Sequence, residues 1–308
     1  MHQSGAENER FVEFLSRLRQ GKCTQDDYRL LQSRVITNSA RHKDDCDWKD
    51  APIIVCDNAS KDELNVRMTM AFAQRTRHTL HWYHCTDKHQ GKILCDKALV
   101  QKMQRLNSRK TNMRLGKIPL VIGMLILVSQ NFDVEGRIVN GSTGKLMKVR
   151  YSLNDEGQRV LRSCIVEISH SMDEALPNLS PHEIPIIKDS TELKFTHPNS
   201  KKMCRITRTQ VPVLPGFVIT AHKSQGQTLE KIIIDLGSKW CRGAEKPYVM
   251  VSHVTSLQSL FVLRPFNYNV ICSHPSQDVR QEMVRLDVLN LNTIIDTPYA
   301  SEEQQKQA

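Results

Sequence analysis

The chain has 308 residues, of which 39% are hydrophobic. That is enough for two small domains, or one large domain, with a sizeable core. The net charge is +10 and the isoelectric point is about 9.2. A basic surplus favours a polyanionic partner, with nucleic acid as the first candidate, although a basic surface without such a partner accounts for the charge equally well.

The cysteines and the apolar runs bear on the cellular compartment. Nine cysteines without a CxxC pair are typical of a reducing compartment. The first ten residues are polar and do not form a signal peptide. The longest apolar run, 118–128, is interrupted by Pro119 and Gly123 and is too short to cross a bilayer. We therefore expect a soluble, non-secreted protein of the nucleus or cytosol, with no membrane partner.

The first fifty residues predict two short helices. Apolar residues recur at helical spacing over 11–18, and a second stripe covers 28–31. Thr24 precedes Gln25-Asp26-Asp27, so we expect it to be an N-cap with acidic residues in the first turn.

The next segment predicts a buried strand followed by a helix. Residues 52–56 form a short apolar run that ends at Asp57-Asn58, a turn or cap pair. The helix should cover 59–75, with apolar residues spaced by four: Leu64, Met68 and Phe72.

A strongly basic segment covers 96–117. Leu99, Met103 and Leu106 predict an inner helical face for its first half. Its seven lysines and arginines could follow a phosphate backbone, or they could simply form the solvated face of a helix.

Short strands with turns predict a small β module over 116–212. The predicted strands cover 120–128, 144–151 and 165–168, with a hairpin-type turn at 140–144, NGSTG. Four prolines among polar residues predict a long loop over 171–202.

Four apolar runs near the C-terminus fit buried parallel strands, namely 217–220, 232–235, 249–251 and 260–263. The last forty residues predict helix and then a disordered tail, 296–308.

The sequence HKSQGQT, His222 to Thr228, is the strongest candidate for chemistry. It follows a predicted strand directly, at the end where ligands bind in open α/β sheets. Lys223 can neutralise a phosphate, and Ser224 and Gln225 can donate hydrogen bonds. Gly226 permits close approach of a backbone. An ordinary polar loop would not need this density of donors.

Several segments resemble the Pif family of superfamily 1B helicases. Phe217 to Leu229, FVITAHKSQGQTL, resembles motif V, and Pro247 to Phe266 resembles motif VI. Ile53 to Ala73, with Asn58 and Asn65, resembles motif IV. Asn131 to Gly144 resembles the segment that opens the family's small SH3-like 2B domain. The resemblance covers about 10–295, and LRPF and RLDVLNLNTI look most like Helitron-transposon helicases.

The resemblance implies a fold and a domain division. The fold is α/β, the second RecA-like domain of a P-loop NTPase with a small SH3-like β-barrel insertion. Residues 1–50 would form a helical linker from a first RecA-like domain, and 116–212 the 2B insertion with its long loop. Residues 51–115 and 213–295 would form domain 2A.

The resemblance also implies site residues. His222, Lys223 and Ser224 would lie towards the DNA backbone, whereas Gln225 and Gly226 would lie towards the nucleotide.

The chain departs from the family in two ways. It has no Walker A sequence, because Gly144-Lys145 is followed by Leu146 and Val139 stands where the first glycine should be. In motif VI, His253 replaces the arginine finger. A histidine is mostly neutral at pH 7 and cannot make the bidentate contact of a guanidinium, so we expect impaired hydrolysis.

A histidine-rich stretch raises the question of a metal site. It contains His78, His81, His84, Cys85 and His89, but no second pair lies at zinc-finger spacing. We therefore expect histidines in a polar connection and no metal site.

The resemblance implies the C-terminal portion of an ATP-dependent 5′–3′ DNA helicase, inactive alone, with single-stranded DNA and a first RecA-like domain, in cis or in trans, as partners. ATP and Mg²⁺ would be cofactors of the intact motor, and neither should bind tightly to this chain alone. Family roles are DNA repair, recombination, telomere maintenance or transposon replication, in the nucleus or the mitochondrion. The alternatives are a non-catalytic, transposon-derived remnant that binds single-stranded DNA, and a larger protein of which this chain is one piece.

Overall fold

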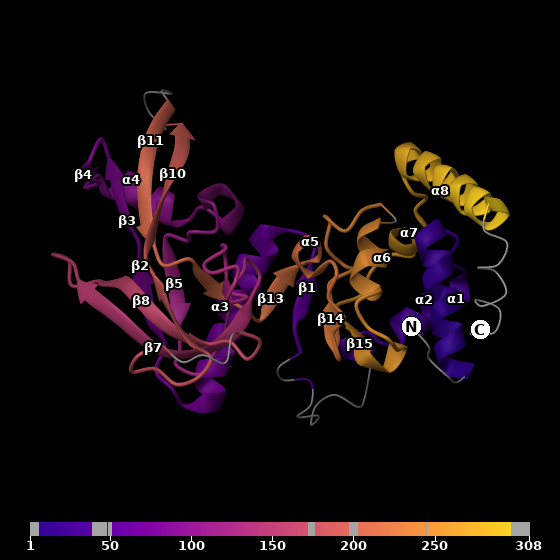
Figure 1. Ribbon diagram of the computed structural model, residues 1–308, viewed down its shortest axis with the longest axis horizontal. Helices are drawn as coiled ribbons and strands as arrows, with labels where there is room; N and C mark the ends of the chain where they lie inside the picture. The colour runs from indigo at the N-terminus through magenta and orange to yellow at the C-terminus, as the bar shows by residue number, and fades with distance from the viewer. Residues whose placement is uncertain are drawn as a thin grey trace. The chain divides into compact units, whose positions relative to one another are not determined.

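The computed structural model describes residues 6–38, 48, 51–171, 176–196, 203–243 and 245–296. These residues divide into two compact units (Figure 1). Unit 1 comprises 1–44, 226–230 and 234–308, and unit 2 comprises 45–225 and 231–233. The predicted tail lies outside the described residues except for its first residue, and the predicted domain boundaries stay a prediction.

Unit 1 is mainly helical. Its elements are α1 (Ala6–Gln20), α2 (Gln25–Gln32), η1 (Ile36–Asn38), α6 (Glu245–Val251), η4 (Leu257–Ser259), β15 (Leu260–Val262), α7 (Asn269–Cys272) and α8 (Gln277–Asp296). The two predicted N-terminal helices are confirmed. Thr24 caps α2 in a reciprocal capping box with Asp27, as the sequence predicted.

Buried aromatic and apolar side chains hold unit 1 together. Phe14, Leu18 and Leu31 from the first two helices are fully buried. The Tyr28 hydroxyl donates to the Phe266 carbonyl at 2.9 Å, and the two rings meet edge to face. Val35 pairs in parallel with Val262 of β15. Residues 262–266 therefore pack on α2 and on Val35, which follows it.

One predicted strand is a helix in the structure. Residues 249–251 end α6 instead of forming a strand. A short apolar run cannot by itself distinguish a strand from a buried helix, and Pro247 is compatible with the first turn of a helix.

Unit 2 contains one strand–helix element and two further sheets. In the first part, β1 (Ile53–Val55) pairs in parallel with β13 (Val218–Thr220), and α3 (Asn58–Thr76) follows β1. On the other side of β1, the Ile233 amide of β14 (Ile232–Ile234) donates to the Pro52 carbonyl. These strands confirm the predicted strands 52–56, 217–220 and 232–235, while β15 of unit 1 confirms 260–263.

The second sheet of unit 2 is close to a closed barrel. Its strand order is β12 (Val213–Pro215), β6 (Leu125–Val128), β7 (Thr143–Leu153), β8 (Arg159–Glu167), β2 (His81–His84) and β5 (Lys117–Leu120), and β9 (Glu183–Ile187) also pairs with β8. Strands β12 and β5, at the two ends of this order, lie next to each other. The small β module of the sequence prediction is therefore present, and it includes β2, which the predicted boundaries placed outside it.

The third sheet has the order β10 (Asp189–Thr196), β11 (Met203–Gln210), β3 (Thr86–His89) and β4 (Lys92–Ile93). Helix α4 (Lys97–Gln104) packs on it through Leu99 and Met103, which meet Leu193 and Ile206 in one apolar cluster. The predicted inner face of this helix is thus confirmed. A short 3₁₀ helix, η3 (Ser108–Thr111), follows it.

Two predictions for the β module were wrong. The predicted strand 120–128 is two strands, β5 and β6, separated by a turn in which Gly123 has φ +87°. The predicted loop 171–202 contains β9 and β10. Pro185 lies within β9, which pairs with β8 alone among the described strands, and an edge strand tolerates a proline because it needs no second hydrogen-bonded neighbour.

Candidate nucleic-acid interface

Strand β13 delivers the HKSQGQT sequence, and two neighbours hold that strand in place. On one side, β1 pairs with it over three residues. On the other, the Asn65 side chain of α3 makes two hydrogen bonds to Val218, one to the carbonyl at 2.9 Å and one from the amide at 3.0 Å. Asn65 is buried, so these bonds are shielded from water. The position at which β13 ends is thereby fixed.

Two basic side chains follow the end of β13 on the short helix α5 (Ala221–Ser224). His222 is exposed and Lys223 is half-buried. The Lys223 ammonium donates to the Asn140 side chain at 2.9 Å, which joins the motif V segment to the NGSTG turn. Burial, and then the nearby ammonium of Lys61, lower the pKa of Lys223. A ligand anion near Lys223 would relieve that repulsion.

The other predicted residues of the loop lie in different surroundings. Ser224 is fully buried, and its hydroxyl donates to the Ala221 carbonyl at 3.0 Å. Gln225 and Gly226 are exposed, and Gly226 has φ +83° with open space where a Cβ would lie. Only glycine adopts such a φ readily, so the chain can turn here. The roles assigned to these three residues stay predictions.

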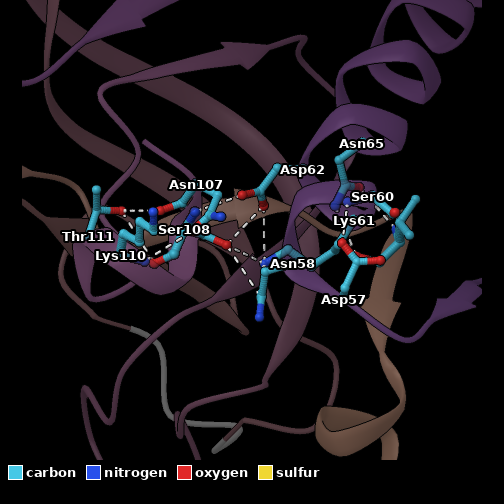
Figure 2. Close-up of polar contacts among 11 residues, drawn as sticks. Asp57, Asn58, Ser60, Lys61, Asp62, Asn65, Asn107, Ser108, Lys110 and Thr111 are labelled. Carbon is cyan, nitrogen blue, oxygen red and sulfur yellow. Dashed lines mark hydrogen bonds and ion pairs between the residues drawn. The ribbon is translucent and has the colours of Figure 1, made fainter. Parts of the chain in front are cut away.

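A buried polar network lies near Lys223, in the segment that resembles motif IV. Asp57 caps α3 by accepting from the Ser60 amide at 2.9 Å. The Lys61 ammonium donates to Ser108 at 2.7 Å and to Asn58 at 3.2 Å, and it lies 3.2 Å from an Asp62 oxygen. Figure 2 shows these groups converging between α3 and η3. Burial lowers the pKa of Lys61 despite the nearby carboxylate.

Lys61 and Lys223 line one hollow together with apolar side chains that include Leu127, Leu214 and Ile219. The three hydrogen-bonding directions of the Lys61 ammonium are taken by Ser108, Asn58 and Asp62. Of the two lysines, Lys223 is therefore the better placed to meet a ligand.

His253 lies in unit 1, after α6. It is 4% exposed, and its Nδ1 lies 2.9 Å from the Gln227 carbonyl, while the Leu229 amide donates to the His253 carbonyl at 2.8 Å. The residue thus holds residues 227–229 through both its side chain and its backbone. Its predicted place in a catalytic centre stays a prediction.

Two arginines of unit 1 could replace the missing finger, and both have other contacts. Arg264 donates twice to buried Asp235, at 2.8 and 2.7 Å. Arg242 donates to the Lys239 carbonyl at 3.0 Å. A bidentate pair with a buried carboxylate is strong, so the contact of Arg264 with Asp235 stabilises the fold.

Sequence reasoning missed the roles of Lys61 and Asn140 in positioning the loop, and it named Asn65 only as part of the segment that resembles motif IV. The available signal was the spacing of Lys61, Asn65 and Thr69, which places three polar residues on one face of α3. That face is the most buried face of the helix, while Leu64, Met68 and Phe72 are only half-buried. The polar face is stabilised by hydrogen bonds to β13 and η3.

The histidine-rich stretch does not form a metal site among the described residues, where no group of three His, Cys, Asp or Glu side chains could hold an ion. It includes a strand, β2, instead of the expected polar connection, so His81 and His84 point to opposite faces. No described helix is long and apolar enough to cross a membrane.

A parallel pair of strands with its helix, next to an almost closed β sheet, defines a RecA-like half with a β insertion. Solved helicases share this fold. The match to Pif1 helicase from Candida albicans has a TM-score of 0.58 and 20% identity, and it covers 90% of this chain and 58% of that chain. The match to Pif1 helicase from Bacteroides in complex with ADP-AlF3 and ssDNA has a TM-score of 0.60 and 17% identity, and it covers 93% of this chain and 55% of that chain.

The sequence is similar to helicases of the same name from other organisms. It is 23% identical to ATP-dependent DNA helicase PIF1 of Xenopus laevis over 265 residues, which are 86% of this chain and 34% of that protein. It is 37% identical to the PIF1 of Emericella nidulans over 82 residues, which are 27% of this chain and 10% of that protein. No protein-family model matches. The chain is therefore Pif1-like in fold and sequence, and it spans only part of the length of these relatives.

Proposed function

We propose that this chain is the C-terminal portion of an ATP-dependent 5′–3′ DNA helicase, and that the loop after β13 contacts single-stranded DNA. The observation that carries the proposal is the placement of His222 and Lys223. They lie at the end of a fixed strand, in a fold shared with a Pif1 helicase solved with ssDNA. Cations at that position would bind the phosphate backbone.

Nucleotide binding by the proposed helicase would require another domain. The sequence has no phosphate-binding loop, and a first RecA-like domain, in cis or in trans, would supply it together with bound ATP and Mg²⁺. Among the groups near motif VI, His253 contacts a backbone carbonyl and Arg264 pairs with Asp235. We therefore expect neither tight ATP binding nor ATP hydrolysis by this chain alone.

A second candidate is a non-catalytic module that binds single-stranded DNA, derived from a Helitron-type transposon helicase. Histidine in place of the arginine finger favours it, because a motor under selection for hydrolysis needs a fixed cation there. In either case we propose a nuclear or mitochondrial protein with a role in DNA repair, recombination, telomere maintenance or transposon replication.

Binding of purified chain to a fluorescein-labelled oligothymidylate, followed by anisotropy over a range of salt concentrations, tests the shared part of both candidates. The affinity should fall as salt rises, by about 0.7 in the log–log slope for each phosphate contacted. A binding curve that does not change with salt, or no binding at low salt, rejects both. Fusion to the first domain of a relative separates them, because only the motor should then hydrolyse ATP.

A further inference from the structure

A cluster of aromatic and cationic side chains lies at the turn end of the β7–β8 hairpin, in unit 2. Tyr151 and Leu153 lie two residues apart on β7 and therefore share a face. They are 45% and 64% exposed, respectively. Arg159 of β8 is the strand partner of Leu153. Figure 1 shows the tip of this hairpin on the side of the unit away from α5, so this cluster is separate from the loop described above.

Contacts with Tyr83 and Arg159 orient the Tyr151 ring. The buried ring of Tyr83, on β2, meets it edge to face at a centroid distance of 5.7 Å and an interplanar angle of 65°. The Arg159 guanidinium carbon lies 4.9 Å from the Tyr151 ring centroid, within the range of a cation–π contact. Burial raises the pKa of the Tyr83 hydroxyl, although a hydrogen bond with Arg159 opposes this shift. A ligand would find the ring already ordered, so it would lose little conformational entropy there.

His81 borders the same cluster. Its ring meets that of Tyr83 at 86° and 6.5 Å. Burial, and then the charge of Arg159, lower its pKa, which favours the neutral imidazole. Arg159 is thus the cation of the cluster, and the other members offer apolar or aromatic surface.

We propose that Tyr151 and Leu153, backed by Arg159, form a platform on which an unpaired base of single-stranded DNA stacks. Every base has a π face, and stacking on an aromatic side chain is tolerant of sequence. Bases within a duplex are already stacked and cannot reach such a surface, so the platform would select single strands. This inference rests on the proposed function, because the basic charge of the chain favours a nucleic acid over a protein as occupant.

The turn between the two strands supports contact with a base instead of a phosphate. It carries Asp155 and Glu156, next to the platform in sequence. Their carboxylates repel a phosphate, and they have no such effect on the face of a neutral base. The backbone of a bound strand would therefore lie on the far side of the base from this turn.

Anisotropy with two labelled strands, oligothymidylate and an abasic strand of equal length, tests the platform in the full chain. Wild type should bind the strand with bases more tightly by about 5- to 150-fold, the range for one stacked base. Tyr151→Ala should lose this preference without weakening binding to the abasic strand. Tyr151→Phe should keep it, and so should the control Met203→Ala, which removes an exposed apolar side chain of β11.

Two outcomes overturn the proposal and are distinct from each other. If wild type and Tyr151→Ala show the same preference, the platform binds no base, whereas salt-dependent binding can still support the proposed function. If wild type binds neither strand, both proposals fail. Wild-type protein offers a check that needs no variant: a strand carrying 5-iododeoxyuridine should photocrosslink within the tryptic peptide from Tyr151 to Arg159. Crosslinks confined to other peptides overturn the platform.

Discussion

The segment after β13 and the segment after α6 are held in different ways, although the resemblance assigns both to one motor. After β13, the half-buried Lys223 ammonium donates to the Asn140 side chain, and His222 is exposed. After α6, His253 is buried against the Gln227 carbonyl. The first segment can meet an external anion by exchanging one hydrogen bond. The second would have to give up a contact that shapes the loop.

Under the proposed function, the first segment would lie towards DNA and the second towards the nucleotide. The segment after β13 carries an exposed histidine and a half-buried lysine on a fixed strand end. In the segment after α6, His253 stands where the resemblance implies an arginine, and its contacts are those of a structural residue. Four substitutions test this contrast, with expected effects that decrease from His253 to Lys61.

His253→Arg should have the largest effect, in a chain fused to the first RecA-like domain of a relative. A fixed cation aimed at the phosphoryl oxygens lowers the barrier to hydrolysis, and arginine fingers contribute about 10³- to 10⁵-fold in rate. DNA-stimulated phosphate release measures the gain. His253→Lys is the matched control, because it restores charge without the planar fork and should recover much less. Equal turnover by folded His253 and arginine fusions would show that another group supplies the cation.

Asn65→Ala should have the next largest effect, on stability. It leaves the buried amide and carbonyl of Val218 without their side-chain partner, at a cost of about 2–4 kcal/mol in the free energy of unfolding. Urea titration followed by circular dichroism measures this loss. Binding of single-stranded DNA should weaken as well, because Asn65 fixes the strand that carries the loop.

A control substitution on the same helix distinguishes the loss of the hydrogen bonds to Val218 from a general effect of mutating α3. Arg67 pairs with Glu63 four residues away, and both side chains are exposed. Arg67→Ala should cost less than about 0.5 kcal/mol. If Asn65→Ala were no more destabilising than Arg67→Ala, the buried amide would not be what holds β13.

Helix α3 also shows which structural features could be predicted from the sequence and which could not. The strand, the Asp57 cap and the helix were predictable because each depends on neighbours within a few residues. The inward face was not, because Asn65 bonds Val218, 153 residues away, and Lys61 bonds Ser108, 47 residues away. Apolar periodicity predicted that Leu64, Met68 and Phe72 form the buried face of α3. In the structure the polar face is buried instead, because its side chains make long-range hydrogen bonds. For α4 the same rule succeeded, because apolar packing alone buries Leu99 and Met103.

The candidate site was predictable to a similar extent. The HKSQGQT sequence indicated the loop and its cations, since their types and order are local. The contact between Lys223 and Asn140 joins residues 83 positions apart and left no local pattern. Strands β9 and β10 were missed because prolines and polar residues are typical of loops, and only pairing with β8 and β11 makes these segments strands.

Lys223→Gln should have a moderate effect, on DNA binding. It removes one cation, so the log–log salt slope should become shallower by about 0.7 and the affinity at low salt should fall several-fold. Lys22→Gln removes an exposed lysine of unit 1 and serves as the control, with no change in slope expected. Anisotropy titrations at four salt concentrations give both slopes. Identical slopes for Lys223→Gln and wild type would remove Lys223 from the interface.

Lys61→Met should have the smallest effect, and it concerns the pH dependence of stability. Burial lowers the pKa of Lys61 in the folded chain below its ordinary value of 10.5. Between the folded and the unfolded pKa the unfolded chain binds more protons, so the free energy of unfolding rises with pH in that window. Below the folded pKa, the cost of burying the ammonium is fully present, and it is relieved as pH rises through that pKa. Wild type should therefore gain stability relative to Lys61→Met as pH approaches 10.5 from below. Urea titrations of both proteins at several alkaline pH values measure the difference, with Lys22→Met as the exposed control. A constant difference across the series would mean that Lys61 keeps its proton at little cost, and that the bonds to Ser108, Asn58 and Asp62 compensate for its burial.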